Sequence, residues 1–244
     1  MIYVVIPIFN EEENIPNLKN ELSNYSFDDS FLIVFSDDGS TDGTKDAIEE
    51  NFDSGSFVII GDGINRGPGA AFNNGFYWVL DHSTSDSDIV VTIESDCTSD
   101  LSILPEMIFL NKIKYDLVLA SVYAQGGGFD STGFFRKLIS SVANLMYRFA
   151  FNIKVQTISS FYRVYKISLL RNIDSKFGTI INENGFICML EILSKSIHCE
   201  AKIIEVPMVL KSTKRLGKSK MKIVKTTIDY LKFLFKLKFK KFSK

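Results

Sequence analysis

The sequence predicts an α/β fold in which a mostly parallel central sheet is covered by helices on both faces. Segments rich in Val, Ile, Leu or Phe alternate with helical segments at the spacing of βαβ units through the first half of the chain. Polar motifs follow these apolar segments, as expected because parallel sheets bind ligands beyond the carboxyl ends of their strands. With 244 residues, of which 45% are hydrophobic, the chain can bury the core of one large domain.

The expected elements alternate regularly along this first half. Each expected strand is a short apolar run, often β-branched, and the strands fall at residues 2–8, 31–36, 57–60, 89–94 and 117–122. The expected helices fill the stretches between them, at residues 12–25, 41–51, 69–81 and 101–111. Strands joined through helices in this way lie parallel, so the order predicts one sheet with helices on its two faces.

The composition predicts a cytoplasmic protein. Three cysteines are too few for a disulfide framework or a zinc site, which suits a reducing compartment. The chain enters its first expected strand at Ile2, without the basic segment of a secretory signal. The apolar stretch 138–153 is interrupted by Asn144 and Arg148, so we expect no membrane span.

The net charge of −1 conceals a strongly basic C-terminal end. Thirteen Lys or Arg residues lie between Lys211 and Lys244, against one acidic residue, Asp229. Residues 221–244 interleave these charges with apolar side chains at helical spacing, which predicts an amphipathic helix at an anionic membrane surface beside a domain of residues 1–220. The alternative is an ordinary surface helix with Lys outside and Phe inside. The large apolar residues favour lipid or protein contact, and we expect no nucleic-acid partner.

An acidic pair, Glu94 and Asp96, follows the expected strand at residues 89–94. Side chains two positions apart in an extended chain point to the same side. A hard cation could therefore lie between these carboxylates and the phosphate oxygens of a substrate. The sequence predicts a metal-diphosphate site here, and the alternative is a simple polar turn.

Three further loops follow expected strands. Residues 7–14 place an acidic cluster in the first turn of a helix, where the helix dipole favours negative charge. Residues 36–44 suit a tight turn and a capped helix, and Asp37 and Asp38 can also accept hydrogen bonds from a nucleobase or ribose. Residues 65–75 open a helix with small residues that let the backbone approach a ligand closely.

Taken together, these motifs resemble those of family 2 glycosyltransferases with the GT-A fold. Four motifs occur in the family's order, at residues 4–12, 37–44, 65–71 and 94–96. Three later segments, at residues 160–166, 204–207 and 215–220, resemble the dolichyl- or polyprenyl-phosphate sugar (mannose) synthases in particular. The resemblance covers nearly the whole chain. It implies an inverting hexosyltransferase that moves a sugar from a GDP- or UDP-linked donor to a polyprenyl phosphate, as a peripheral protein at the inner face of the membrane.

The resemblance also implies a role for each matching residue. Glu94 and Asp96 correspond to the metal motif, which holds Mg²⁺ or Mn²⁺ on the donor diphosphate. The residues implied in substrate binding are Pro7, Phe9, Glu11, Asp37, Asp38, Arg66, Gly69, Ser95 and Arg136. Those implied in catalysis, through the metal and the phosphate groups, are Asp96, Arg163, Arg215 and Lys220. The last two lie in a glycine-containing loop that we expect to order over the nucleotide.

The chain departs from the family pattern near the sugar and the acceptor. Glu94 stands where Asp is usual, and its extra methylene moves the carboxylate, which leaves the choice of metal open. Val122, Thr157 and Phe161 replace residues typical of the synthases, so mannose specificity is not transferred. The QxxRW signature of processive polysaccharide synthases is absent, which indicates a single transfer.

Two other functions stay open. The acceptor could instead be a saccharide or lipid-linked saccharide in surface-polysaccharide assembly, and a carboxylate such as Asp100 or Asp130 then has to remove the hydroxyl proton. The chain could also be a non-catalytic protein that binds nucleotide sugars, with a metal site weakened by Glu94. Because no membrane span is expected, a membrane-protein partner is compatible with either transferase.

Overall fold

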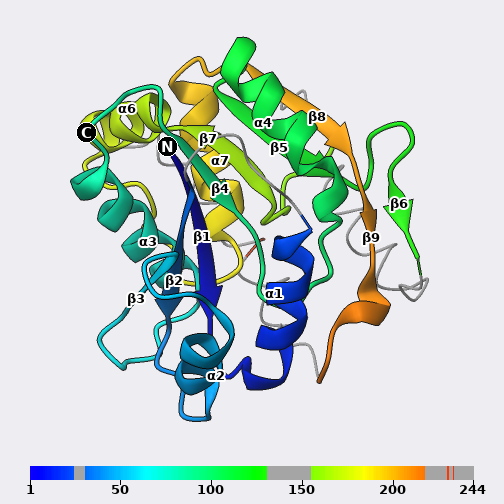
Figure 1. Cartoon of the computed structure of the whole chain (residues 1–244). Helices are drawn as coiled ribbons and strands as arrows, with labels where there is room; N and C mark the ends of the chain where they lie inside the picture. The colour runs from blue at the N-terminus through cyan, green and yellow to red at the C-terminus, as the bar shows by residue number, and fades with distance from the viewer. Residues whose placement is uncertain (25–30, 131–154, 218–229, 231–232, 234–244) are drawn as a thin grey trace.

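The computed structural model describes residues 1–24, 31–130, 155–217, 230 and 233 of the 244-residue chain. Its main sheet has seven strands in the order β3-β2-β1-β4-β7-β5-β8 (Figure 1). These strands are β1 (Ile2–Ile8), β2 (Phe31–Asp37), β3 (Phe57–Ile60), β4 (Ile89–Thr92), β5 (Leu117–Ser121), β7 (Arg163–Lys166) and β8 (Ile203–Pro207). β7 runs antiparallel to β4 and β5, and the other pairs are parallel, which confirms the predicted mostly parallel sheet.

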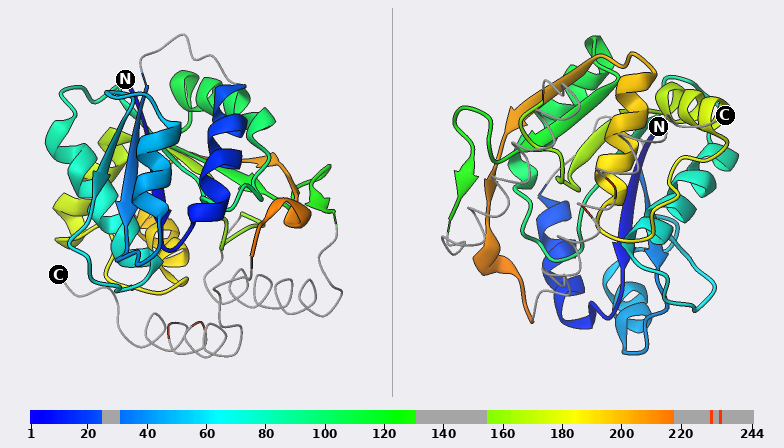
Figure 2. Two further views of the ribbon diagram at one scale, coloured as in Figure 1. Left: turned by 60° about the horizontal axis from the view of Figure 1, so that its bottom comes forward. Right: turned by 180° about the vertical axis from the view of Figure 1, so that it is seen from behind.

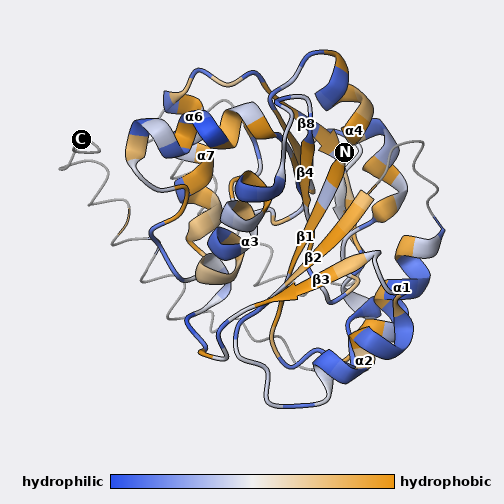
Figure 3. Cartoon of the chain, turned by 60° about the vertical axis from the view of Figure 1, so that its left-hand side comes forward, coloured by the Kyte–Doolittle hydropathy of each residue, from blue (hydrophilic) through white to orange (hydrophobic). Residues whose placement is uncertain are grey.

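Helices cover both faces of this sheet, as predicted. The helices are α1 (Ile15–Ser23), α2 (Thr44–Asn51), α3 (Pro68–His82), α4 (Leu104–Ile113), α6 (Ile167–Phe177) and α7 (Cys188–His198). The apolar side chains of α3, α6 and α7 form one buried cluster with one face of the sheet. Those of α1, α2 and α4 form a second cluster on the opposite face. Figure 3 shows the apolar strands inside and polar residues on the outer sides of α1 and α2.

The strand order contains a topological switch point between β1 and β4. From β1 the chain builds outward through β2 to β3, and it then returns to place β4 on the other side of β1. In open α/β sheets the loops after two such strands leave in opposite directions, and ligands bind in the region between them, which we call the crevice. The sequence motifs after β1 and β4 lie on the two sides of this region.

Several predicted boundaries differ from the structure by a few residues, and three of the differences lie near the site. The helix predicted from residue 12 begins as a 3-10 turn, Glu12–Asn14, before α1 starts. Helix α2 begins at Thr44 instead of residue 41, because Asp42 Oδ1 accepts Thr44 N at 3.1 Å and ends the preceding turn. Strand β4 ends at Thr92, so the acidic pair lies in the turn after the strand and not on its last pleat.

A small second sheet extends the domain on the side of β8 (Figure 2). It pairs β6 (Gly128–Phe129) with β9 (Val209–Leu210) in parallel. After β9 the chain forms the 3-10 turn Ser212–Lys214 and continues to Gly217. This segment brings basic residues back to the crevice.

Of residues 221–244, the structure describes Tyr230 and Phe233. Phe233 is 4% exposed and Tyr230 is half-buried, and both pack against the cluster formed by α3, α6 and α7. At these two positions the aromatic side chains face the protein, as in the ordinary surface helix that was the alternative. The other positions of the predicted membrane-surface helix lie outside the described residues. Among the described helices, none combines the length and apolar character needed to cross a bilayer.

Candidate active site

Loops from β1 and β2 are joined to each other at one end of the crevice. Asn10 N donates to Ser40 Oγ at 3.0 Å, and Asn10 Oδ1 accepts Thr41 N at 2.8 Å. One residue later, Glu11 N donates to Thr44 Oγ1 at 2.8 Å. Asn10 adopts a left-handed conformation with φ 52°, which an Asn tolerates better than most residues. The two loops therefore act as one rigid wall.

The predicted ligands of the first loop lie along this wall. Pro7 and Phe9 flank the last residue of β1 and are half-buried. Glu11 is 9% exposed, and its Oε2 accepts Asn14 Nδ2 at 2.7 Å. Because β1 pairs with β2 up to Ile8, these residues lie beside Asp37 and Asp38. Their predicted contact with a nucleotide stays a prediction.

Asp37 organises the turn after β2. Its Oδ1 accepts Ser40 N at 2.9 Å, and its Oδ2 pairs with Lys45 Nζ at 3.1 Å. Burial by itself raises the pKa of this carboxyl, but the hydrogen bonds from Ser40 and Lys45 outweigh burial and hold the pKa below its ordinary value. The side chain is 1% exposed, so Asp37 shapes the loop and presents no surface to a ligand.

Asp38 joins the second polar loop to the third. Its Oδ1 accepts Arg66 N at 2.7 Å, and its Oδ2 accepts Gly67 N at 2.8 Å. Burial raises the pKa of Asp38 above its ordinary value, although these two backbone donors oppose the shift. A carboxylate offers about four lone-pair sites, so Asp38 keeps capacity to accept a hydrogen bond from a nucleobase. That contact stays a prediction.

The small residues of the third loop serve a close contact within the chain. Gly67 has φ 104°, and a side-chain carbon on Gly69 would lie 2.0 Å from the carbonyl oxygen of Glu183. Gly69 N donates to Asn184 O at 2.7 Å. A backbone that approaches Gly69 is therefore the chain's own, and the predicted ligand contact at that residue stays a prediction. The guanidinium of Arg66 pairs with Asp62 at 2.7 Å on the surface.

A buried ion pair on α7 supports the loop at residues 179–184. Glu191 and Lys195 lie 2.8 Å apart with side chains 2% and 1% exposed. The Glu191 carboxylate accepts the backbone N–H groups of Asn182 and Glu183, and Lys195 Nζ donates to the carbonyls of Thr179 and Ile180. The sequence analysis missed this pair, whose only local signal is a Glu–Lys spacing of four on a helix.

Residues 94–96, which follow β4, form what we call the acidic exit. Within it, Asp96 is held by several hydrogen bonds. It is 8% exposed, and its Oδ1 accepts Thr98 N at 3.1 Å and Thr98 Oγ1 at 2.8 Å. Its Oδ2 accepts Arg215 Nε at 2.7 Å and a second N–H of the same guanidinium. Ser95 is buried and Glu94 is half-buried beside it. The structure therefore brings two predicted catalytic residues, Asp96 and Arg215, into direct contact.

The acidic exit fits a hard divalent cation in its chemistry. Within the described residues, no group of three or more His, Cys, Asp or Glu side chains is arranged to enclose a metal. A metal would therefore take carboxylate oxygens from Glu94 and Asp96 and complete its shell from a substrate diphosphate, as Mg²⁺ commonly does. The guanidinium of Arg215 on Asp96 marks the place where this chain already stabilises a positive charge.

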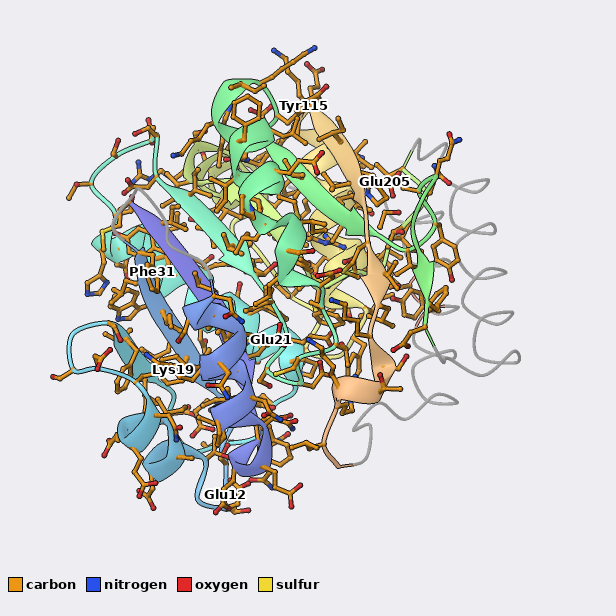
Figure 4. The ribbon with its side chains drawn as sticks, turned by 45° about the vertical axis from the view of Figure 1, so that its right-hand side comes forward. Glu12, Lys19, Glu21, Phe31, Tyr115 and Glu205 are labelled. Carbon is orange, nitrogen blue, oxygen red and sulfur yellow. The ribbon has the colours of Figure 1, made fainter. Side chains whose placement is uncertain are left out.

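Arg163 is buried and is held by the backbone of its own chain. It is 0% exposed, its Nε donates to Ser160 O at 2.7 Å, and a terminal N–H donates to Ile158 O at 2.9 Å. Backbone carbonyls thus accept two of the guanidinium's hydrogen bonds, and the predicted phosphate contact stays a prediction. Glu205 on β8 (Figure 4) holds the other end of the same segment by accepting Thr157 N at 2.8 Å. Both residues position the chain that crosses the ends of β4 and β5.

The remaining candidates fall outside the crevice or outside the described residues. Arg136 and Lys220 lie outside the described residues. Asp100 caps a 3-10 turn by accepting Ser102 N at 3.1 Å, and it also pairs with Lys211. Asp130 accepts Ser212 N at 2.9 Å. These contacts use Oδ1 of Asp100, whereas those of Asp130 use both of its oxygens.

The fold and this site define a glycosyltransferase with the GT-A fold. Residues 3–174 match the model of the family described as Glycosyl transferase family 2, and the chain belongs to that family. The structure resembles glucosyl-3-phosphoglycerate synthase from Mycobacterium tuberculosis in complex with phosphoglyceric acid, with a TM-score of 0.68 over 96% of this chain and 79% of that one. The same synthase in complex with Mn²⁺, UDP-glucose and phosphoglyceric acid gives a TM-score of 0.69 over 98% and 79%. The identities are 17% and 16%, which establishes the fold.

Three curated relatives match most of the chain. The dolichol-phosphate mannosyltransferase of Pyrococcus furiosus is 29% identical, over 97% of this chain and 63% of its own length. The polyprenol monophosphomannose synthase of Mycolicibacterium smegmatis is 27% identical over 89% and 80%. The undecaprenyl-phosphate mannosyltransferase of Micrococcus luteus is 28% identical over 90% and 87%. The chain thus spans less than two thirds of the length of the Pyrococcus relative.

Proposed function

We propose that this chain is an inverting, metal-dependent hexosyltransferase that moves a sugar from a nucleotide-sugar donor to a polyprenyl phosphate. The observation that carries the proposal is the contact of Arg215 with Asp96 beside the switch point of the sheet. A carboxylate suited to a metal and a guanidinium suited to a phosphate meet there. The names of the three relatives support a polyprenyl phosphate as acceptor and mannose as the first sugar to test.

In this proposal the joined loops hold the nucleotide and the acidic exit holds its diphosphate. Glu94 and Asp96 would ligate Mg²⁺ or Mn²⁺, which when bound neutralises charge on the departing diphosphate. Arg215 adds charge-assisted hydrogen bonds to the same diphosphate. Asp38 accepts from the base, and the rigid loop wall keeps the donor in one orientation, so that the anomeric carbon faces the acceptor.

The chemistry of the acceptor and the contacts of the two candidate bases support a phosphate acceptor. A phosphate monoester has a second pKa of about 6 and is anionic near neutral pH, so it can attack without a general base. A sugar hydroxyl needs one, and the candidates Asp100 and Asp130 are both used as caps. Burial raises the pKa of Asp100, but its bonds to Ser102 and Lys211 outweigh this and lower it, which makes Asp100 a still weaker base.

We further propose that the protein works at the inner face of the membrane, where residues 221–244 meet anionic lipid. The thirteen basic residues from Lys211 onward support electrostatic binding, since each Lys or Arg near such a surface contributes about 1 kcal/mol. Flotation of the full chain with vesicles tests this. Binding to vesicles rich in phosphatidylserine but not to pure phosphatidylcholine is expected, and equal behaviour with both would contradict it. A membrane-protein partner stays a prediction.

The decisive experiment is a donor panel with a defined acceptor. The full chain is incubated with UDP- and GDP-linked sugars, Mg²⁺ or Mn²⁺, and a short-chain polyprenyl phosphate, and label in the lipid extract is counted. We expect label from one donor, loss of label on chelation, and loss in Asp96→Asn. The matched control is Asp53→Asn, because the Asp53 side chain is 90% exposed on the surface.

Each other outcome points to a different function. Donor hydrolysis or transfer to saccharide with no lipid label would favour the saccharide acceptor. Nucleotide-sugar binding without any turnover would favour the non-catalytic alternative. Activity that persists unchanged in Asp96→Asn would contradict the placement of the diphosphate at the acidic exit.

A further inference from the structure

Residues 211–217, which we call the strap, run from β9 past the end of β4 to the start of α1 (Figure 1). Lys211 N donates to Thr98 O at 2.9 Å. Lys214 forms an ion pair with Glu21, which is labelled on α1 in Figure 4. Neither contact is made with Asp96 itself, although Thr98 also donates to Asp96 Oδ1, so the strap is held at points other than the contact between Arg215 and Asp96.

Asn14 fastens the strap at its far end. It is 5% exposed, its Oδ1 accepts Leu216 N at 3.1 Å, and its Nδ2 donates to Leu216 O at 3.3 Å. One side-chain amide thus pairs with both backbone groups of Leu216, as a neighbouring strand would. The same Nδ2 donates to Glu11 Oε2 at 2.7 Å, which ties the strap to the loop after β1.

Arg215 lies between the two fastened ends of the strap, and its guanidinium occupies the position on Asp96 that a metal cation would take. Both Asp96 oxygens are used by the protein, Oδ1 by Thr98 and Oδ2 by the guanidinium. A divalent cation that approaches Asp96 meets a full positive charge on Oδ2 and has to displace it. Like charges at this separation repel, and the partly buried site weakens the screening by water.

We infer that Asn14 is a positioning residue that keeps Arg215 on Asp96. Metal then enters only together with an anionic diphosphate, which binds the Arg215 guanidinium in place of Asp96. The inference rests on the proposed function, because it assumes a nucleotide diphosphate as the incoming anion. A bidentate guanidinium exchanges one oxyanion for another without a change of its own charge. Since the strap is fastened on both sides of Arg215, the exchange needs movement of one side chain only.

The inference predicts strong coupling between metal and nucleotide. Binding of Mn²⁺ to the full chain is measured by the loss of the free-ion EPR signal, alone and with UDP or GDP. For the wild type we expect weak binding alone and much tighter binding with nucleotide. Charge-assisted hydrogen bonds contribute about 1.5–3 kcal/mol, so Arg215→Gln should bind Mn²⁺ alone about tenfold more tightly or better. In that variant, UDP or GDP should increase the Mn²⁺ affinity by a correspondingly smaller factor.

Two results would overturn the exchange. One is equal nucleotide-free Mn²⁺ affinity in the wild type and Arg215→Gln. The other is Mn²⁺ binding that survives in Asp96→Asn, because the metal would then lie elsewhere. Arg215→Lys is the conservative variant, and it should restore part of the coupling because it keeps the charge but loses the forked geometry.

Asn14→Ala tests the positioning role by a double-mutant cycle. We expect it to raise nucleotide-free Mn²⁺ affinity at least about threefold, and to add nothing in the Arg215→Gln background, because it acts through Arg215. Additive effects would show that Asn14 acts independently and would overturn its role. The matched control is Asn17→Ala at an exposed position of α1, which should change neither value.

The same measurements separate this inference from the proposed function. If coupling follows the prediction but no donor gives transfer, the exchange holds and the transferase proposal fails. If transfer to lipid occurs and Arg215→Gln leaves metal binding unchanged, the exchange fails and the transferase proposal holds. In active protein, Asn14→Ala should raise the donor KM more than it lowers kcat, since it disturbs donor loading.

Discussion

Glu191→Gln tests whether one buried ion pair holds the loop at residues 179–184 in place. In the wild type the Glu191 carboxylate accepts the backbone N–H groups of Asn182 and Glu183 and pairs with Lys195. The loop that it holds supplies Asn184 O to Gly69 N, at the start of α3. A single change on α7 should therefore alter both the stability of the fold and the loop before α3, whose residues Arg66 and Gly67 donate to Asp38.

The expected loss of stability follows from the hydrogen bonds that a glutamine amide NH₂ cannot accept. Oε1 accepts Asn182 Nδ2 and Lys195, while Oε2 accepts Asn182 N and Glu183 N, so a glutamine NH₂ faces donors whichever way it turns. The charge of Lys195 is left in a site that is 1% exposed. Breaking a buried pair costs about 3–5 kcal/mol, and we expect the lower end because Lys195 keeps two carbonyl partners.

Urea denaturation measures this change as a lower midpoint at an unchanged slope. Glu106→Gln is the matched control, because Glu106 is exposed on α4 and the same substitution there should stay within about 0.5 kcal/mol. A loss below about 1 kcal/mol for Glu191→Gln would refute the reasoning, since the pair would then contribute no more than a surface pair. In folded protein the donor KM should also rise.

Three further predictions use other parts of the site. Gly69→Ala places a carbon 2.0 Å from Glu183 O and should lower the unfolding free energy by about 1–3 kcal/mol in a denaturation curve; an unchanged midpoint would contradict the close packing. The folded-state pKa of Asp37 is depressed, so its carboxylate stabilises the fold above its ordinary pKa of 3.8 and loses this effect as the pH falls below that value. The stability difference between wild type and Asp37→Asn should therefore shrink with acidification, and a constant difference would argue against it. Burial raises the pKa of Cys97 to about 12, so iodoacetamide at neutral pH should label half-buried Cys199 first, as read by mass spectrometry, and early labelling of Cys97 would contradict its burial.

Local sequence predicted the strands around the switch point because each is buried on both faces. The runs that form β1, β2 and β4 are apolar at nearly every position, as expected for strands covered by helices on both sides. The antiparallel direction of β7 was not predicted, since the residues of a short strand do not encode its direction. Direction depends on the route by which the chain enters the sheet, and that is a property of the whole topology.

Contacts of the site between neighbours in the sequence were predictable, whereas contacts between remote residues were not. Loop residues that cap their own turn, such as Asp37 with Ser40, follow from local turn chemistry. The contacts that complete the site are remote: Arg215 lies 119 residues from Asp96, and Leu216 lies 202 residues from Asn14. No local pattern encodes such pairs, so the sequence located the loops but not their partners.

Arg163 shows why a charged residue in a motif does not by itself indicate a ligand. An arginine is seldom fully buried unless it is paired, which made a substrate phosphate a reasonable partner. Here the partners are the carbonyl groups of Ser160 and Ile158, which lie in an irregular segment and lack strand neighbours. A buried carbonyl without a donor costs about as much as a lost hydrogen bond, so the guanidinium stabilises the segment without any ligand.

Asp38 and Asp96 are both held by hydrogen bonds, but their partners differ, and under the proposed function this difference sets the order of binding at the site. Each carboxylate is nearly buried and already bonded to the chain. The partners of Asp38 are backbone N–H groups, which cannot leave without unfolding the loop, so a base can only add to them. The partner of Asp96 on Oδ2 is a side chain, which can move to another anion. Under the proposed function, a nucleotide can therefore bind at Asp38 before anything changes at Asp96. In the proposed exchange its diphosphate then takes the guanidinium of Arg215, and Asp96 becomes available to the metal that enters with the diphosphate.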